Sequence, residues 1–458
     1  MSANNGIITY QNGAYQTSAV YYSPIASIAT TGQPLGTFYC FLSRVKSWPT
    51  ETLPPAPTED QKYLKDTFKN MFVARKIYSN DMSPVVERID WTSGEVYDYY
   101  RDDIDMFARD TNGTILRRFF VKNRFDQVFK CLWNNNGGVV STEPYFEPGN
   151  FNANQIFQGA DDYKWKYMYT ITSGSKLKFM DDAWMPVPIS TRIPNPFSSF
   201  AGRGSIDVIN VTNGGSGYDP SNATITVTVT GDGLYATANA TVVSGSISDI
   251  VVANTGSNYS YANVTISSTL GSNAVAIAPA SPIGGHAYDP VTELGVRHVM
   301  MTARFTGNES GKLPTDIDFR QIGILVNPYA YFGNVTGLAN ADIYKTTTDF
   351  VLSQGFGVYA PDETVYQSPN GLLSASTFTA TVLSFDVATN TLKLINTLGV
   401  ANNSAVIYGA TTGTARVVVQ QQTPDFIPFS GYLTYLENRE PVQRNADGSE
   451  IFKLVLGY

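Results

Sequence analysis

Charged side chains are scarce in this sequence, and they are unevenly distributed. Asp, Glu, Lys and Arg make up 15% of the 458 residues, whereas a globular domain typically carries about 25%. The formal net charge of −8 at pH 7 argues against a generally basic nucleic-acid-binding protein. Aromatic residues are abundant, with 28 Tyr, 25 Phe and 5 Trp. The chain therefore has enough apolar surface to fold, and global disorder is not expected.

Cysteine and histidine are also rare, which narrows the possible chemistry. Cys40 and Cys131 are the only two cysteines, and both lie in apolar, strand-like runs. One disulfide is arithmetically possible, but we expect two buried, reduced thiols. The two histidines, His286 and His298, would have to converge to bind a metal, and we expect structural roles for both. We predict no metal site and no cofactor.

Long apolar runs are missing as well. No stretch approaches the roughly 18 residues that a membrane span needs. The first basic residue is Arg44, so the basic start of a signal peptide is lacking. We expect a soluble product that is made in a cytoplasm and has neither a membrane nor a nucleic acid as a partner.

Local patterns predict many strands and one clear helix. Thr58-Glu-Asp-Gln61 has the form of a capping box, and apolar residues follow at helical spacing, which predicts a helix near 58–74. Those apolar residues are Leu64, Phe68, Met71 and Phe72. Strands are expected before the helix within residues 1–57, and at 115–121, 127–133, 164–171, 298–305, 321–326 and 451–456. In the stretch 164–171, alternation predicts one shared face for Trp165, Tyr167, Tyr169 and Ile171.

Residues 204–296 differ sharply from the rest of the chain. They contain no Lys or Arg, and six acids give them −6 of the total charge of −8. These acids are Asp207, Asp219, Asp232, Asp249, Asp289 and Glu293. Residues 204–225 also match residues 245–266 at 12 of 22 positions, which marks a duplicated unit. We predict a compact acidic β-module that projects from a nearly neutral framework and can be deleted without unfolding it.

The predicted fold class is α+β, predominantly β, with an antiparallel β-sandwich framework, a few helices and two inserted β-modules. The second insert, also poor in charge, is expected to be a small barrel or sandwich. The predicted segments are framework at 1–203, the repeat module at 204–296, framework at 297–345, the small barrel or sandwich at 346–422, and C-terminal framework strands at 423–458.

Clustered acids are the candidates for catalysis, and they include Asp102, Asp103 and Asp105, and Asp316 with Asp318. Asp161 with Asp162, and Asp181 with Asp182, lie near tryptophans in the sequence. A glycosidase needs two such carboxylates about 5–10 Å apart. Acidic doublets are more often turn and cap residues, so a structural or binding protein is favoured over a hydrolase.

Six segments, in one order along the chain, carry a resemblance to a known family. They are Phe41–Pro49, Arg88–Trp91, Val128–Leu132, Gly159–Ile171, Phe319–Pro328 and Ser430–Pro441. Together they resemble the baseplate wedge subunit called gene product eight in T-even-type contractile-tailed phages. Where the family has Arg-Asp-Trp, this chain has Ile89 between the Arg and the Asp. The resemblance leaves out 204–296 and 346–422, which look like insertions.

The resemblance implies a structural subunit without catalytic residues. Such a subunit forms homodimers, contacts other wedge subunits in the tail baseplate of the virion, and takes part in the rearrangement that triggers sheath contraction. The motif residues then have structural roles: Trp48, Asp90, Trp91, Trp165, Arg320, Asn327, Pro328, Glu437, Asn438, Arg439 and Pro441. Glu437 is expected to pair with Arg439, and the tryptophans are expected to fill cores. A receptor-binding or glycan-binding tail protein remains the main alternative, and a tail-associated polysaccharide hydrolase is a third.

Overall fold

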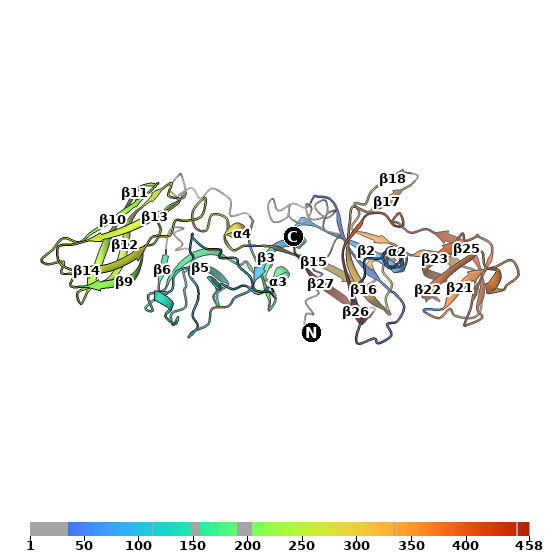
Figure 1. The fold of residues 1–458 in the computed structure, drawn as a ribbon. Coiled ribbons are helices and arrows are strands. Elements are labelled where there is room, and N and C mark those ends of the chain that lie inside the picture. Colours follow the sequence, from blue (N-terminus) through green and yellow to red (C-terminus); the bar gives the residue numbers. More distant parts are fainter. Residues whose placement is uncertain are drawn as a thin grey trace. The chain divides into compact units, whose positions relative to one another are not determined.

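The computed structural model describes residues 35–111, 113–147, 156–189, 204–333, 335–445 and 448–457. The chain is built mostly from β-strands, with several antiparallel sheets and a few short helices, as the predicted fold class requires (Figure 1). It forms two compact units: unit 1 joins residues 1–82 to 299–458, and unit 2 holds residues 83–298. The residues predicted to form one framework are thus divided between both units. The strands expected before residue 35 lie outside the described residues.

Unit 1 contains a five-stranded sheet in the order β19-β2-β1-β16-β26. Its strands are β1 (Phe38–Ser43), β2 (Met71–Ile77), β16 (Ile317–Val326), β19 (Ile343–Lys345) and β26 (Tyr432–Arg444). Two neighbouring strands, β15 (His298–Thr306) and β27 (Ser449–Gly457), belong to a second sheet. The central strand β1 is buried along its whole length, because both faces of this sheet are covered.

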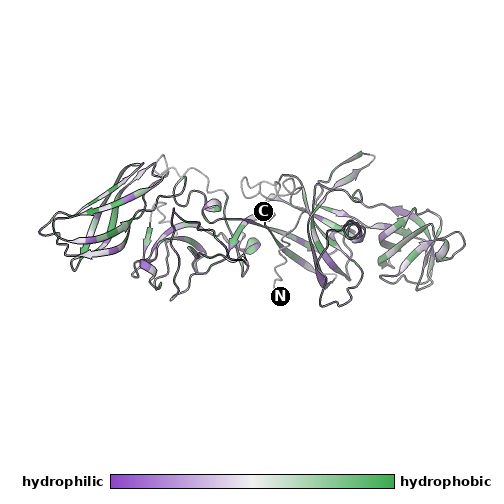
Figure 2. Ribbon diagram, viewed as in Figure 1, coloured by the Kyte–Doolittle hydropathy of each residue, from purple (hydrophilic) through white to green (hydrophobic). Residues whose placement is uncertain are grey.

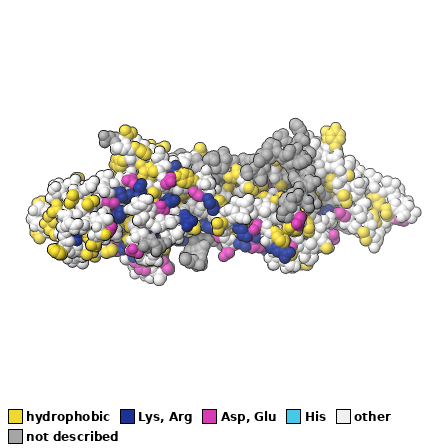
Figure 3. Space-filling model, turned by 180° about the vertical axis from the view of Figure 1, so that it is seen from behind, with side chains coloured by type: hydrophobic (Ala, Val, Ile, Leu, Met, Phe, Trp, Pro, Cys, Tyr) yellow, Lys and Arg dark blue, Asp and Glu magenta, His cyan; other side chains and the backbone are white. Residues whose placement is uncertain are grey.

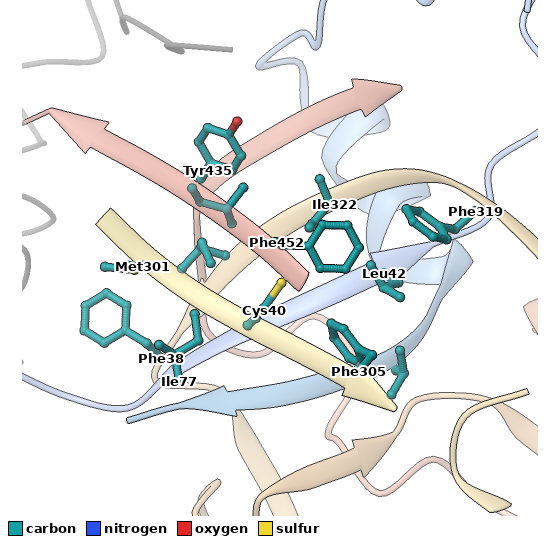
Figure 4. Packing of buried hydrophobic residues seen from close by; sticks show 14 of the residues in the cluster. Phe38, Cys40, Leu42, Ile77, Met301, Phe305, Phe319, Ile322, Tyr435 and Phe452 are labelled. Carbon is teal, nitrogen blue, oxygen red and sulfur yellow. The ribbon is translucent and has the colours of Figure 1, made fainter. Parts of the chain in front are cut away.

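The main core of unit 1 fills the space between these strands. Phe38, Cys40 and Leu42 alternate along β1 and point to one side, where Met301 and Phe452 pack against them (Figure 4). The opposite face of the same strand packs against the helix α2 (Gln61–Asn70) and the segment around residue 426. Cys40 and Cys131 are both buried free thiols, as expected.

The predicted helix is shorter than the sequence pattern indicated. Asp60, not Thr58, caps it, since its carboxylate accepts a hydrogen bond from the Tyr63 N–H at 2.8 Å. Thr58 instead donates its hydroxyl hydrogen to Asp60. The helix ends at Asn70, and Met71 begins β2. The apolar spacing failed at this end because Met71 and Phe72 are buried by strand pairing with β1.

A closed barrel occupies most of the stretch predicted as the second insert. Its strands follow the order β20-β23-β22-β21-β24-β25. They are β20 (Thr348–Leu352), β21 (Thr364–Gln367), β22 (Phe378–Asp386), β23 (Thr391–Gly399), β24 (Val406–Gly409) and β25 (Ala415–Gln422). Buried side chains such as Phe350, Val382 and Leu392 fill its interior. A separate hairpin, β17 (Tyr329–Phe332) with β18 (Val335–Leu338), precedes the barrel in the sequence.

Unit 2 begins with a four-stranded sheet in the order β4-β5-β7-β6. Its strands are β4 (Phe120–Lys122), β5 (Gln127–Trp133), β6 (Ile156–Gln158) and β7 (Lys164–Thr170). Strand β3 (Met82–Glu87) pairs with β8 (Trp184–Pro186), which follows helix α3 (Ser173–Phe179). Both faces of β7 are buried, since Lys164 and Lys166 are 7% and 3% exposed and Trp165 between them is 0% exposed. The sequence pattern did not indicate that these lysines would be buried. Only three residues around 115–122 form a strand.

The duplicated sequence forms a six-stranded sheet in the order β12-β11-β10-β13-β14-β9. Corresponding strands of the two repeats (β9 and β12, β10 and β13, β11 and β14) lie at equal distances from the centre of the sheet, so the order is palindromic. The strands are β9 (Asn210–Ser216), β10 (Thr226–Gly231), β11 (Leu234–Val243), β12 (Ser246–Ser257), β13 (Ala262–Ser267) and β14 (Ser272–Ile277). Hydrophobic and polar residues alternate along them (Figure 2). The first repeat supplies β9, β10 and β11, and each has a counterpart in β12, β13 and β14.

Backbone hydrogen bonds confirm this internal symmetry. Tyr259 N–H donates to the Gly204 carbonyl at 2.9 Å, and the equivalent Tyr218 N–H donates to the Gly245 carbonyl at 3.0 Å. Each repeat therefore completes the other, and neither is a closed unit by itself. A short helix, α4 (Pro290–Glu293), follows the module.

Gly215 and Gly256 occupy equivalent positions in the two repeats, and the structure explains why both are glycine. Gly215 and Gly256 have φ values of 62° and 61°, a region that favours glycine. A Cβ at Gly215 would lie 2.3 Å from the Ser272 carbonyl oxygen, and one at Gly256 would lie 2.5 Å from that of Leu234. Both positions, near the ends of β9 and β12, therefore require glycine for conformation and for space.

Candidate interaction surfaces

Motif residues from three distant segments of the sequence meet in unit 1. Trp48 donates its indole N–H to the Arg439 carbonyl at 2.8 Å. Asn438 accepts hydrogen bonds from the Tyr63 hydroxyl at 2.7 Å and from Gln321 Nε2 at 2.8 Å. Its amide nitrogen donates to the carbonyl of Pro55 at 2.7 Å. The loop before α2, strand β16 and strand β26 are therefore tied together through Asn438.

Arg320 extends the same attachment. Its guanidinium donates to both carboxylate oxygens of Glu51, at 3.2 and 3.1 Å, and to the Ser47 hydroxyl at 3.3 Å. The Arg320 side chain is 9% exposed but that of Glu51 is 36% exposed, so the contact is shielded on one side only and fixes the loop through its bidentate geometry.

The expected pair between Glu437 and Arg439 forms, but it lies within one strand. Arg439 Nε is 2.8 Å from a Glu437 oxygen, and Tyr435 donates its hydroxyl hydrogen to the other oxygen at 2.8 Å. All three residues are on β26 and share one face, so the pair does not join that strand to another. Pro441, on the same strand, is exposed.

Asn327 and Pro328 shape the exit from β16. Asn327 has a φ of 52°, which Asn tolerates better than most residues. Its side-chain oxygen accepts a hydrogen bond from the Thr37 N–H, and its own N–H donates to the Thr37 carbonyl, both at 2.9 Å. The start of β1 is thereby fastened beside the end of β16.

The motif residues of unit 2 have mixed surroundings. Trp165 is completely buried and stacks on Tyr163 with ring centroids 5.6 Å apart. Trp91, like Trp48, is only half-buried, so neither fills a core. Asp90 is paired with Arg88 at 2.7 Å and with Lys122 at 3.2 Å.

A buried cluster of charged groups lies where α4 packs on β5. Lys130 is 0% exposed and forms an ion pair with Glu293, whose side chain is 2% exposed. His286 Nδ1 lies 3.8 Å from the same carboxylate and has no hydrogen-bond partner. Tyr100 places its ring 4.8 Å from the Lys130 ammonium. The sequence contained one signal for this cluster, a lysine in the middle of the apolar run that forms β5.

Burial and charge act in opposite directions in this cluster. Burial alone would raise the pKa of Glu293, but the ammonium of Lys130 and the adjacent His286 outweigh it and lower this pKa to about 2. Burial, reinforced by Lys130, lowers the pKa of His286 to about 4. Near neutral pH Glu293 is therefore a carboxylate and His286 an uncharged imidazole. Burial also lowers the pKa of Lys130, against the opposing effect of Glu293.

The acids of the repeat module do not all face solvent, which corrects the picture of a simply projecting acidic insert. Asp249 pairs with Lys164 of β7 at 2.7 Å, and Asn210 donates its side-chain amide to the Leu132 carbonyl at 2.9 Å. The outer surface is still free of basic side chains (Figure 3). Part of the charge thus serves to attach the module.

The acidic doublets behave as turn and cap residues. Asp161 accepts hydrogen bonds from the backbone N–H groups of Ser141 and Thr142, at 2.6 and 2.8 Å. Asp181 accepts from the N–H groups of Ala183 and Trp184, at 2.8 and 2.7 Å. In the described ranges, no three His, Cys, Asp or Glu side chains are grouped as metal ligands. These contacts support the structural interpretation of the acids.

Apolar surface is the other conspicuous feature of unit 1. The hairpin β17–β18 has five large hydrophobic side chains that are 42–67% exposed. A cavity of about 350 Å³ lies between α2, the barrel strand β23 and residues 424–430. Phe68, Leu325 and Phe426 are among its lining residues. Exposed apolar patches of this kind mark interaction sites on many proteins.

Two further findings bear on the protein's class. No helix in the described part of the chain combines the length and apolar character that crossing a bilayer requires. Neither a family model nor a curated protein matches the sequence.

Proposed function

We propose that this chain is a structural subunit of a phage tail baseplate wedge. It acts as a homodimer that bridges neighbouring wedge subunits, and it takes part in baseplate assembly and in the rearrangement that triggers sheath contraction. Its place is the virion, and its role is non-enzymatic. The proposal rests on the six-segment sequence resemblance and on the geometry of the matched residues.

The convergence of the motif residues is the observation that carries this proposal. Trp48, Arg320 and Asn438 come from three matched segments, and all three fasten the loop before α2 to β16 and β26. In unit 2, two further matched segments pair as β5 and β7, with Cys131 opposite Trp165. A chance set of short matches would have no reason to coincide with the contacts between segments.

Electron microscopy of virions tests the proposal directly. The two units should fit density inside the baseplate wedge, with copies related by a twofold axis. Density for this chain on a fibre, or absence of the chain from purified virions, would refute the assignment. Sedimentation of the purified chain at several concentrations tests the homodimer separately.

A glycan-binding tail protein is the second candidate, and one observation favours it. Tyr235 and Tyr261 of the repeat module are 76% and 54% exposed, and Tyr235 has a φ of 71°, which is unusual for a bulky residue and is often associated with function. Binding to a glycan array that is lost in Tyr235→Ala would support this candidate over the wedge subunit.

A further inference from the structure

The hairpin β17–β18 presents an uncharged surface. Residues 329–338 contain no Asp, Glu, Lys or Arg. Tyr329, Tyr331 and Leu338 lie on one face and are 46%, 47% and 49% exposed, and Val335 near the tip is 67% exposed. Hydrophobic side chains are visible where this hairpin projects (Figure 3). The solvent-exposed surface of this hairpin is therefore apolar and lacks the charged side chains that usually occur on protein surfaces.

One edge of the hairpin is already used. Tyr331 N–H donates to the Asp425 carbonyl at 3.1 Å, and Ile427 N–H donates to the Tyr329 carbonyl at 2.9 Å. These bonds lie along the outer edge of β17. Among the described strands, β18 pairs only with β17.

The orientation of the backbone groups on β18 follows from the alternation of an antiparallel pair. Ala339 N–H donates to the Pro328 carbonyl at 2.8 Å, so the N–H groups of Thr336 and Leu338 point away from β17. No Lys, Pro or bulge protects this edge, although natural edge strands commonly carry such protection. The edge has the properties of a site that accepts an added strand.

The position where the chain enters the described structure indicates the occupant. Thr37 is bonded to Asn327 through two hydrogen bonds of 2.9 Å, and β17 begins two residues after Asn327. Residues 1–34 therefore join the described part of the chain at the base of this hairpin.

The sequence of this N-terminal segment matches the surface. Residues 1–34 contain no Asp, Glu, Lys, Arg or His, and Ala19-Val-Tyr-Tyr22 is a run of strong strand formers. The 12 residues from 23 to 34 span up to about 40 Å when extended. A four-residue strand is only about 13 Å long, so the connection is long enough to return along β18.

We propose that residues 19–22 of the same chain add as a third strand to the open edge of β18. The added strand bonds to the N–H groups of Thr336 and Leu338 and places every second side chain beside those on the exposed face of the hairpin. This inference does not depend on the baseplate function, because it uses only the hairpin and the segment that enters beside it.

Hydrogen exchange of the full chain, read by mass spectrometry on a peptide covering 335–338, tests the inference. Protection is expected in the wild type. In Val20→Asp/Tyr22→Asp, exchange of this peptide should rise at least tenfold. The matched control Ile7→Asp/Tyr10→Asp introduces the same charges elsewhere in the segment and should leave the rate unchanged. Circular dichroism should show that both variants remain folded.

A reciprocal variant tests the other side of the contact. Thr336→Pro removes an N–H that points away from β17, so the hairpin keeps its own bonds, while a peptide covering 17–23 should exchange at least tenfold faster. Unprotected 335–338 in the wild type, or protection that survives both variants, would overturn the proposal. Protection that disappears on dilution would assign the edge to a second copy and overturn it equally.

Discussion

The two inserted modules are attached to their units by different physical means. The barrel contributes Leu383 and Ile395 to the main apolar core of unit 1. The repeat module keeps an apolar core of its own, built from residues 206–280. It meets the β5–β7 sheet through polar groups such as Asn210 and Asp249. Two inserts that are equally poor in charge by sequence therefore respond differently to pH and to mutation.

This difference arises because one attachment buries apolar side chains and the other buries charged and polar groups that need partners. An apolar attachment gains from the removal of surface from water and changes little between pH 4 and 8. A buried ion pair has a large desolvation cost that only its partner offsets, so removal of one partner is severe. The barrel also has a charged contact, Asp349 with Lys345 and Lys393, but there two lysines share one carboxylate.

The largest expected effect is that of deleting residues 204–296. This deletion removes Glu293 and leaves Lys130, which is completely buried, without a carboxylate partner, so we expect unit 2 to unfold, contrary to the expectation from the sequence. A shorter deletion, 211–276, keeps Glu293 and removes only Asp249, the partly exposed partner of Lys164. It should leave unit 2 folded, because Asn210 and Ile277 are paired neighbours that a short turn can join. Trp fluorescence and circular dichroism distinguish the outcomes. If the protein stayed folded after the longer deletion, the conclusion that buried charged contacts make the repeat module's attachment sensitive would be wrong.

The single substitution Lys130→Met should destabilise unit 2 by about 3–5 kcal/mol, since it leaves a carboxylate buried beside an uncharged imidazole. The double variant Lys130→Met/Glu293→Gln should recover much of the loss. Four of the five tryptophans lie in unit 2, so denaturant unfolding monitored by their fluorescence reports on this unit.

The matched variant in the barrel is Lys393→Met, which removes a pair between β23 and β20 and leaves Lys345 beside Asp349. Its expected cost is about 1 kcal/mol. An equal loss in the Lys130 and Lys393 variants, or no recovery in the double variant, would show that the two charged contacts do not differ in kind.

Acidification should weaken unit 2 before unit 1. The pKa of His286 in the folded chain, about 4, is below its unfolded value of 6.5, so the unfolded state binds more protons and stability falls as pH drops from about 6.5 to 4. The linked loss is about 3 kcal/mol. The pKa of Glu293, about 2, adds a loss in the same direction below pH 4.5.

Denaturant midpoints measured between pH 7 and 4 check this dependence. His298, whose pKa burial and nearby arginines also lower to about 4, gives a slope of the same sign in unit 2. His286→Gln should therefore reduce the slope by about half without removing it. A slope unchanged in this variant would mean that the cluster does not set the pH response.

The β26 contacts of unit 1 include the smallest expected effect, that of Arg439→Ala. Asn438→Ala leaves Tyr63 and Gln321 without their shared acceptor and should cost about 1–3 kcal/mol. Arg439→Ala breaks only a pair within one strand and should cost less than about 1 kcal/mol. Thermal melting of both variants should give this order, and the reverse order would assign the attachment to the ion pair.

The sequence predicted elements well where local pattern and tertiary burial agree. Strand β5 was expected at 127–133 and occupies those residues, because its apolar run is buried on both faces. The helix end failed because pairing with β1 overrides helical spacing at Met71. Lys130 and Glu293 are 163 residues apart, and no local pattern reports such a contact. The exposed edge of β18 was equally invisible, since a strand's neighbours are a property of the whole sheet.

The palindromic sheet has a consequence for how this chain can change over generations. Because each repeat supplies backbone hydrogen-bond partners to the other, loss of one repeat by recombination would leave the other incomplete. We therefore expect the two repeats to be gained or lost together. Asn210 and Ile277 leave the sheet side by side, and both splice points therefore lie at one place. The module has the properties of a cassette that can be exchanged for another, provided that the incoming segment leaves the lysine partners in place.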